Sequence, residues 1–333
     1  MAVRIVIADK FEKQGIEALA AMGCEVTVDP DLGPETLPAA LDRLKPEILV
    51  VRSTKVPASV IGSCDSLRGI IRAGSGYDNI DGSAARERGI DVCNCPGMNA
   101  VAVAELTIGH LLNLDRRLSA QDAELKAGHW NKKEFSKARG LKGRTMLVIG
   151  LGAIGREVAS RAKAFGIKVF GANRHIAPDM AAALGIEAVG SDRASILKAL
   201  PTMDIVSVHV PANDETKGMC DAAFFDAMKE GAYFINTSRG ALVDEPALIE
   251  AVQQRGIRAG LDVYQNQPAF KEGDWDSAVA KLAGVVCSHH IGASTDQAQQ
   301  AVAEEVVRLV RVFQDTGRFE NVVNAGRSAT ADV

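Results

Sequence analysis

The chain has 333 residues, of which 47% are hydrophobic and 24% are charged, and its formal net charge is −4. This length is too great for one ordinary hydrophobic core and predicts a globular protein of two domains. The modest negative charge gives no indication of nucleic acid or an anionic membrane as a partner.

The first third of the sequence alternates short β-branched runs with alanine-rich helical stretches. Its opening apolar run is followed closely by Asp9, so it lacks the long apolar region of a signal peptide and predicts a strand instead. The alternation indicates parallel strands joined by crossover helices, with helices at Phe11–Met22 and Glu35–Lys45. The predicted strands of this series are Val3–Ala8, Glu25–Val28, Ile48–Val51, Gly69–Arg72 and Asp91–Cys93.

A long predicted helix, Val101–Arg117, separates this series from a second one. Residues 119–142 are polar and are predicted to form an irregular arm that includes Trp130. A final helix, Thr295–Thr316, is expected to return to the first domain and to be followed by a disordered tail at 328–333. The strands predicted for the second series are Met146–Gly150, Lys168–Ala172, Ile205–Val208, Tyr233–Asn236, Gly260–Val263 and Val285–Ser288.

We therefore expect an α/β protein made of two Rossmann-like domains with a cleft between them. The first is expected to be a flavodoxin-like substrate-binding domain that comprises residues 1–100 and 295–333. The second is expected to be a dinucleotide-binding domain that comprises residues 101–294.

The cysteines give no indication of a metal site or a disulfide framework. Six are scattered along the chain, and only Cys93 and Cys95 lie close together. No second pair completes a zinc site, so we expect no metal. Reduced thiols suit a cytoplasmic protein, and no apolar run reaches the roughly 18 residues of a membrane span.

A glycine pattern marks the start of the second series. Gly150, Gly152 and Gly155 follow an apolar strand and open a helical run, which is the context that a dinucleotide fingerprint requires. The first glycine would make the tight turn, the second would let the backbone approach a pyrophosphate, and the third would allow close packing of helix on strand. The helix N-terminus would supply N–H groups to the phosphates.

The end of the next strand carries no acid to bind the ribose 2′-hydroxyl of NAD. It reads Ala172-Asn173-Arg174; Asn173 has no charge to repel a 2′-phosphate, and Arg174 could pair with one. The pattern favours NADP(H) over NAD(H). The alternative is that Asn173 binds the ribose hydroxyls and Arg174 stacks on the adenine.

Short segments with distinctive Arg, Gly, Asp and His residues occur in order over nearly the whole chain. They are residues 51–56 (VRSTKV), 72–81 (RAGSGYDNID), 94–99 (NCPGMN), 103–105 (VAE), 128–131 (GHWN), 209–211 (HVP), 236–240 (NTSRG), 261–263 (LDV) and 290–293 (HIGA). In these segments the chain resembles the D-2-hydroxyacid dehydrogenases, and most of all their phosphoglycerate dehydrogenase branch. We expect this protein to lack the large regulatory C-terminal domains of that branch, so serine feedback through such a domain is not expected.

The resemblance implies a catalytic arginine, glutamate and histidine. The arginine would be Arg239, whose planar guanidinium can hold the carboxylate and carbonyl oxygen of a 2-keto acid. The histidine would be His290, which would take the hydroxyl proton in oxidation or return it in reduction. Gln267 stands in place of the glutamate, as in the formate dehydrogenases of this superfamily. An amide can orient His290 but adds no charge beside it.

The resemblance also implies the residues around the substrate and the cofactor. Backbone N–H groups of Ser75 and Gly76 would hold the substrate carboxylate. Arg52 and Arg72 would bind a substrate phosphate, or would serve as positive charge for any carboxylate substrate. Further substrate-binding candidates are Ser53 and Asn99. Further cofactor-binding candidates are Ala153, Ile154, His175, Val210, Pro211, Thr216, Thr237, Ser238, Asp262, Gly292 and Ala293, together with Arg239 and His290.

Two other histidines are given no catalytic role by the sequence. His110 lies on the long helix and is expected to be a packed core residue. His129, beside Trp130 in the polar arm, is expected to serve a subunit contact or the mouth of the substrate site. The family resemblance implies a homodimer built through that arm.

The expected activity is hydride transfer between NAD(P) and a small D-2-hydroxy acid or 2-keto acid, as in phosphoglycerate dehydrogenases. A glyoxylate or hydroxypyruvate reductase that prefers NADPH is an alternative. A formate-dehydrogenase-like enzyme would explain Gln267. A non-catalytic dinucleotide sensor is a fourth possibility, against which the presence of both Arg239 and His290 argues.

Overall fold

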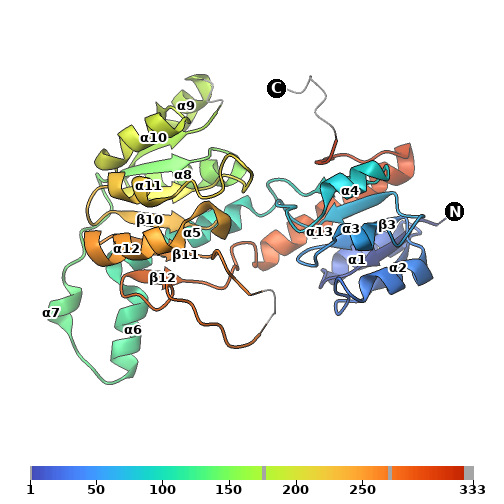
Figure 1. Cartoon of the computed structure of the whole chain (residues 1–333), viewed down its shortest axis with the longest axis horizontal. Helices are drawn as coiled ribbons and strands as arrows, with labels where there is room; N and C mark the ends of the chain where they lie inside the picture. Colours follow the sequence, from blue (N-terminus) through green and yellow to red (C-terminus); the bar gives the residue numbers. More distant parts are fainter. Residues whose placement is uncertain (1, 175–177, 269–271, 326–333) are drawn as a thin grey trace. The chain divides into compact units, whose positions relative to one another are not determined.

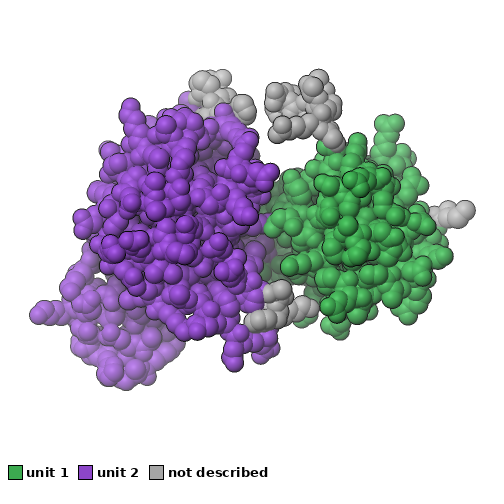
Figure 2. All heavy atoms as spheres, in the orientation of Figure 1, with its two compact units in different colours: residues 1–99, 294–333 green, residues 100–293 purple. Residues whose placement is uncertain are grey.

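The computed structural model describes residues 2–174, 178–268 and 272–325 (Figure 1). The chain divides into two compact units, shown in different colours in Figure 2. Unit 1 comprises Met1–Asn99 and Ser294–Val333, and unit 2 comprises Ala100–Ala293. Within the described part of the chain, no helix combines the length and apolar character that crossing a membrane requires.

Unit 1 is a five-stranded parallel sheet with helices on both faces. The strand order is β2-β1-β3-β4-β5, which is the flavodoxin-like order of doubly wound folds. The strands are β1 (Arg4–Ile7), β2 (Glu25–Val28), β3 (Ile48–Val51), β4 (Gly69–Arg72) and β5 (Asp91–Asn94). The helices are α1 (Lys13–Ala21), α2 (Leu37–Leu44), α3 (Ala58–Ile61), α4 (Gly82–Glu87) and α13 (Asp296–Thr316).

The central strand β3 shows why this sheet needs cover on both faces. All four of its residues are fully buried, and successive side chains of a strand point to opposite faces. Leu49 and Val51 pack in one apolar cluster with residues of α2 and α3. Ile48 and Val50 pack in another, with residues of α1 and α13. The final helix of the chain therefore completes the core of the N-terminal unit.

Unit 2 is a seven-stranded parallel sheet in the order β12-β11-β10-β9-β6-β7-β8. From β8 to β11 this is the dinucleotide-binding strand order. The strands are β6 (Thr145–Ile149), β7 (Lys168–Ala172), β8 (Glu187–Val189), β9 (Ile205–Val208), β10 (Tyr233–Asn236), β11 (Arg258–Leu261) and β12 (Val285–Cys287). The α-helices around the sheet are α5 (Ala100–Arg116), α8 (Ala153–Ala164), α9 (Pro178–Leu184), α10 (Arg193–Ala199), α11 (Ala222–Ala227) and α12 (Glu245–Arg255); the 3-10 helices are η1 (Leu200–Thr202) and η2 (Gly240–Leu242). The predicted parallel α/β class is thus confirmed in each unit.

The prediction of an irregular arm at 119–142 was wrong. This segment contains α6 (Leu118–Lys126) and α7 (Lys132–Phe135). Neither helix buries a residue in the single chain, so the sequence carries no apolar periodicity to reveal them. Polar contacts help to define α7: Asn131 caps its N-terminus, and Arg117 forms an ion pair with Glu134 at 2.7 Å. The short edge strand β8 was also not predicted.

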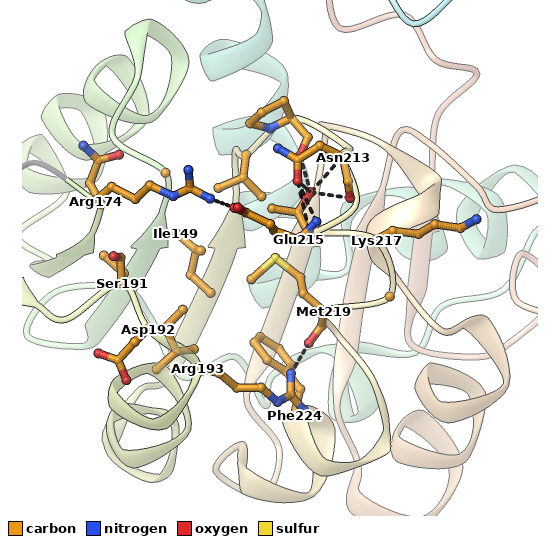
Figure 3. A pocket seen from close by; sticks show the side chains of 18 of the residues that line it. Ile149, Arg174, Ser191, Asp192, Arg193, Asn213, Glu215, Lys217, Met219 and Phe224 are labelled. Atoms are coloured by element: carbon orange, nitrogen blue, oxygen red, sulfur yellow. Dashed lines mark hydrogen bonds and ion pairs between the residues drawn. The ribbon is translucent and has the colours of Figure 1, made fainter. Parts of the chain in front are cut away.

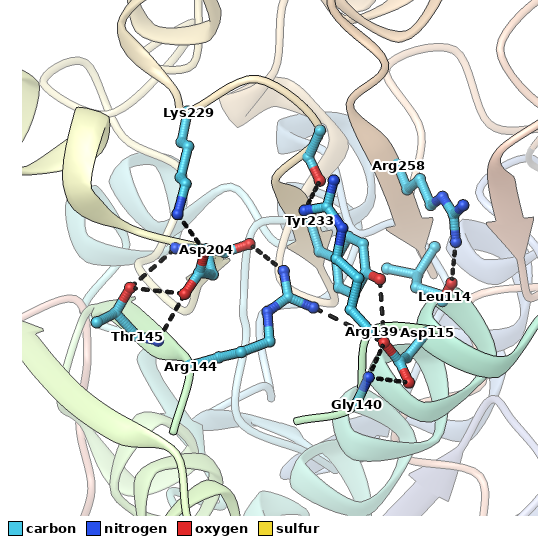
Figure 4. A network of polar contacts seen from close by, with 11 residues as sticks. Leu114, Asp115, Arg139, Gly140, Arg144, Thr145, Asp204, Lys229, Tyr233 and Arg258 are labelled. Carbon is cyan, nitrogen blue, oxygen red and sulfur yellow. Dashed lines mark hydrogen bonds and ion pairs between the residues drawn. The ribbon is translucent and has the colours of Figure 1, made fainter. Parts of the chain in front are cut away.

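The two ends of the arm are fastened to unit 2 by a buried carboxylate (Figure 4). Asp115 is 2% exposed and accepts the Gly140 N–H at 3.1 Å and the Tyr233 hydroxyl at 3.1 Å. The Arg144 guanidinium lies 4.2 Å from the centre of the Tyr233 ring. Because residues 115 and 140 meet here, the arm leaves and re-enters the unit at one place.

Candidate active site and dinucleotide pocket

The glycine-rich turn, residues 150–155, has the close backbone approaches that its sequence predicts. Gly150 has φ +94°, and a Cβ there would lie 2.7 Å from the His209 carbonyl oxygen. A Cβ on Gly155 would overlap the Gly150 carbonyl oxygen, so α8 packs tightly on the turn. Gly152 is the N-cap of α8 and no side chain caps the helix there. Its Cβ position faces open space, which leaves the helix N-terminus accessible to an anion.

A cavity of about 800 Å³ lies beside this turn (Figure 3). One wall comes from the ends of β6 and β7 and includes Gly150, Asn173 and Arg174. The facing wall comes from the loop after β9 and includes Pro211 and Thr216. The volume suits a large organic ligand, and the cavity is continuous with the turn, so the described residues fit a dinucleotide.

An acid reaches Arg174 from a different loop. Asn173 accepts a hydrogen bond from the Leu151 N–H at 3.3 Å, while Arg174 forms an ion pair with Glu215 that Figure 3 shows across the pocket. Glu215 was not predicted as a site residue, because an acid near the cofactor ribose was expected only at the end of β7. The predicted cofactor residue His175 lies outside the described residues.

Three predicted catalytic residues lie in the loops that follow β10, β11 and β12. These strands are neighbours in the sheet, and the carboxyl ends of parallel strands share one edge. Gln267 Nε2 lies 2.8 Å from His290 Nδ1. Arg239 precedes Gly240, where a Cβ would overlap the Tyr264 carbonyl oxygen. The arginine loop is therefore packed against the start of the segment that carries Gln267.

The arginine loop is tied to its own strand by polar contacts. The Asn236 side chain donates to the Arg239 carbonyl oxygen at 2.9 Å and accepts the Ser238 N–H at 3.0 Å. The Arg239 guanidinium donates to the Ser238 carbonyl oxygen at 2.8 Å. Thr237 is bound to the Thr107 hydroxyl of α5 at 2.9 Å. These contacts hold the predicted cofactor residues Thr237 and Ser238 beside the predicted catalytic arginine.

Asp262, predicted to face the nicotinamide, directs its carboxylate to the histidine loop. It is 1% exposed and accepts the Ser288 hydroxyl at 2.6 Å and the N–H groups of Ile291 and Gly292 at 2.9 Å each. His290 has φ +55°, a conformation that non-glycine residues adopt at a cost of about 1 to 3 kcal/mol. The surrounding hydrogen bonds fix this conformation. Ser288 was not predicted as a site residue.

The predicted substrate residues lie in unit 1, at the end of β4 and in the loops after β3, β4 and β5. Asp9, at the end of β1, accepts the N–H groups of Arg52 and Ser53 at 2.6 and 3.1 Å and the Ser53 hydroxyl at 2.9 Å. The Arg52 guanidinium donates to Gln299 of α13 at 2.8 Å. Asp9 and Gln299 were missed, because only the fold brings them to this loop.

The turn after β4 is closed by contacts between the predicted residues. Gly74 has φ +148°, and a Cβ there would overlap the Arg72 guanidinium, which folds back over the turn. The Ser75 hydroxyl donates to the Asn99 side chain at 2.7 Å. Asn94 donates to the Ser75 carbonyl oxygen at 2.6 Å. These hydrogen bonds fix the conformation of the turn that includes Gly76, and the Arg72 guanidinium lies against it.

The doubly wound sheet of unit 2 and its glycine-rich turn define a dinucleotide-binding protein. The family model described as "D-isomer specific 2-hydroxyacid dehydrogenase, NAD binding domain" matches residues 108–292. The chain belongs to this family, which confirms the resemblance seen in its sequence.

Relatives of this family cover nearly the whole chain. The chain is 39% identical to D-3-phosphoglycerate dehydrogenase of Methanocaldococcus jannaschii over 97% of its own length and 59% of that protein. It is 36% identical to D-3-phosphoglycerate dehydrogenase of Rattus norvegicus, over 97% of this chain and 58% of the relative. The chain thus spans somewhat less than two thirds of the curated relatives that it matches.

Solved structures of similar proteins match over almost their full length. A glyoxylate reductase from Paecilomyes thermophila has a TM-score of 0.85 and 26% identity, over 97% of this chain and 98% of that one. An NADPH-dependent glyoxylate/hydroxypyruvate reductase from Sinorhizobium meliloti, in complex with NADP and malonate, has a TM-score of 0.82 and 28% identity, over 97% of each chain.

Proposed function

We propose that the chain is an NAD(P)-dependent oxidoreductase that transfers hydride between the cofactor and C2 of a small D-2-hydroxy acid or 2-keto acid. The observation that carries the proposal is the hydrogen-bonded pair of Gln267 and His290, in the same unit as the glycine-rich turn. Phosphoglycerate dehydrogenation is the favoured activity, because the relatives named above carry that activity in their names.

A nicotinamide cofactor, when bound, would supply the hydride for reduction and would accept it in oxidation. Arg239 would hold the carboxylate and carbonyl oxygen of the acid with its planar fork of donors. His290 would donate a proton to the carbonyl oxygen from Nε2, because its Nδ1 is engaged by Gln267. In oxidation the same nitrogen would take the hydroxyl proton. Arg52, Arg72 and the turn after β4 would bind the acidic groups of the substrate.

We infer that NADP(H) binds at least as well as NAD(H). Asn173 and Arg174, which directly follow β7, carry no carboxylate to repel a 2′-phosphate, and Arg174 lines the pocket, where its guanidinium could pair with that phosphate. The ion pair of Arg174 with Glu215 weakens this preference, because a 2′-phosphate must compete with the carboxylate for the guanidinium.

A reductase of glyoxylate or hydroxypyruvate is the second candidate. Structural neighbours of that name favour it. The contact of Arg52 with Gln299 also favours it, because it occupies one of the guanidinium donors that could otherwise bind a phosphate.

A substrate panel tests the proposal. It comprises 3-phosphoglycerate, glycerate, hydroxypyruvate, glyoxylate and formate, each with both cofactors, and His290→Asn serves as the catalytically impaired control. We expect turnover of at least one 2-hydroxy or 2-keto acid. Turnover of formate alone would replace the proposal with formate oxidation. No turnover with any compound, despite tight NADPH binding, would favour a dinucleotide sensor.

We also propose a homodimer built through the arm. Trp130 is 81% exposed and Leu125 is 54% exposed, and both line a groove with Phe135. Such exposed apolar surface, on α6, on α7 and in the loop between them, suits a protein contact. Light scattering should give twice the chain mass for the wild type and the single mass for Trp130→Ser with Leu125→Ser; a monomeric wild type would refute this assembly.

The free thiols of all six cysteines suit a reducing, cytoplasmic setting.

A further inference from the structure

A histidine without an assigned role lies behind the candidate catalytic loop. His110, on α5, is 3% exposed, and its Nε2 lies 2.9 Å from the Ser288 hydroxyl. Its Nδ1 is buried and has no hydrogen-bond partner among the described residues. The ring approaches β11 closely because residue 260 is glycine; a Cβ there would lie 2.9 Å from His110 Cβ.

The chemistry of the three groups fixes the direction of their hydrogen bonds. An ionised carboxylate can only accept, so the Ser288 hydroxyl donates to Asp262 at 2.6 Å. The Ser288 oxygen then accepts from His110, which places the imidazole proton on Nε2. Burial lowers the pKa of His110, and the opposing effect of Asp262 is smaller. The lowered pKa favours the neutral ring, which acts as the first donor in a series of hydrogen bonds from His110 through Ser288 to Asp262.

This series of hydrogen bonds ends at the backbone around His290. The two N–H groups that Asp262 accepts belong to Ile291 and Gly292, the residues directly after the left-handed His290. On the other side of the loop, the Tyr264 hydroxyl donates to the Ser288 carbonyl oxygen at 2.9 Å. A left-handed conformation at a non-glycine residue persists only where its surroundings determine it.

We propose that His110 is a positioning residue for His290, acting through Ser288 and Asp262. By donating to the Ser288 oxygen, it polarises that hydroxyl and strengthens its hydrogen bond to Asp262. The carboxylate is then held in the orientation that binds both N–H groups of the histidine loop. In this way His110, on α5, helps to fix the orientation of the His290 imidazole. The catalytic consequence rests on the proposed hydride transfer.

Two substitutions separate positioning from packing. His110→Met keeps much of the buried volume and removes the donor, whereas His110→Gln keeps an N–H donor at the position of Nε2. We expect kcat for keto-acid reduction to fall about tenfold or more in His110→Met, because small misplacements of catalytic groups have effects of that size. His110→Gln should recover most of the loss, with KM for NADPH unchanged in both variants. Equal losses in the two variants would overturn the proposal.

A double-mutant cycle tests the route through Ser288. If His110 acts through the hydroxyl, Ser288→Ala and His110→Met should each lower kcat, and the double variant should lose little more than the worse single variant. Losses that multiply would mean that His110 acts independently of Ser288, which would refute the proposed route.

Amide hydrogen exchange provides a test that needs no activity. We expect the N–H groups of Ile291 and Gly292 to exchange about tenfold faster in His110→Met than in wild type, as the loss of about one hydrogen bond's net stability predicts. Their exchange should be near wild type in His110→Gln. Unchanged exchange in His110→Met would refute the positioning role. An enzyme that turns over no acid, yet shows these exchange rates, would instead refute only the proposed function.

Discussion

Replacement of Gln267 by glutamate tests the proton chemistry of the candidate active site. The Gln267 amide faces His290 Nδ1 at 2.8 Å. It can donate to a bare Nδ1 or, after rotation by a half turn, accept from a protonated one, so it serves both charge states of the ring. A glutamate can only accept, and its negative charge favours the imidazolium.

The size of the effect follows from the distance. At 2.8 Å, the attraction between unit charges amounts to about 1.5 kcal/mol in a dielectric of about 80. The water-like dielectric is appropriate, because Gln267 and His290 are both exposed. One pKa unit corresponds to about 1.4 kcal/mol, so the pKa of His290 should rise by about one unit in Gln267→Glu.

The assay is a pH–rate profile of keto-acid reduction. Reduction needs protonated His290, so kcat/KM falls as pH rises through the pKa of that group. In Gln267→Glu this fall should move to higher pH by about one unit. The matched control is Gln265→Glu, which adds the same charge to the same exposed loop without the hydrogen bond to His290. Superimposable wild-type and Gln267→Glu profiles, or equal shifts in both variants, would refute the reasoning.

Other outcomes follow from the same structure. Asn173→Asp should shift preference toward NADH by at least tenfold in the ratio of Kd values, because a carboxylate repels the 2′-phosphate; an unchanged ratio would mean that residue 173 does not face the ribose. Glu215→Gln should tighten NADPH binding and leave NADH binding unchanged in the same titrations, and equal tightening of both would contradict that reasoning. If 3-phosphoglycerate is the substrate, Arg52→Ala or Arg72→Ala should raise KM for it far more than for glycerate; equal effects would assign these arginines to the carboxylate or the fold. Burial lowers the pKa of His110, so the unfolded chain binds a proton below pH about 6.5 that the folded chain does not, and stability falls as pH drops. The Tm of His110→Gln should therefore fall less than that of wild type between pH 7 and pH 5. Equal falls in Tm would exclude a contribution of His110 to the pH dependence of stability.

Sequence patterns were sufficient for those parts of the fold that depend on local chemistry. Runs such as Ile48–Val51 are apolar at every position, which only a sheet covered on both faces accommodates. The turn at 150–155 was recognisable because its backbone needs glycine at fixed spacing. In both cases the residue type determines the local conformation directly.

The arm shows where such patterns give no information. The helices α6 and α7 bury nothing within the chain, so their sequence carries no apolar stripe that faces a core of the same chain. The two ends of the arm are held instead by hydrogen bonds at its base, where Asp115 accepts from Gly140 and Tyr233. Those partners are far apart in sequence, and no local pattern connects them.

The sequence alone determined the family, the order of the strands along the chain and the residue types at the edge where the chemistry is expected. Only the tertiary structure decided which of those side chains meet. Asp9 reaches the Arg52 loop, Glu215 reaches Arg174, and His110 reaches Ser288 from separate elements. The physical reason is that parallel strands bring distant loops to one edge, while the hydrogen bonds between those loops depend on distances that only packing sets.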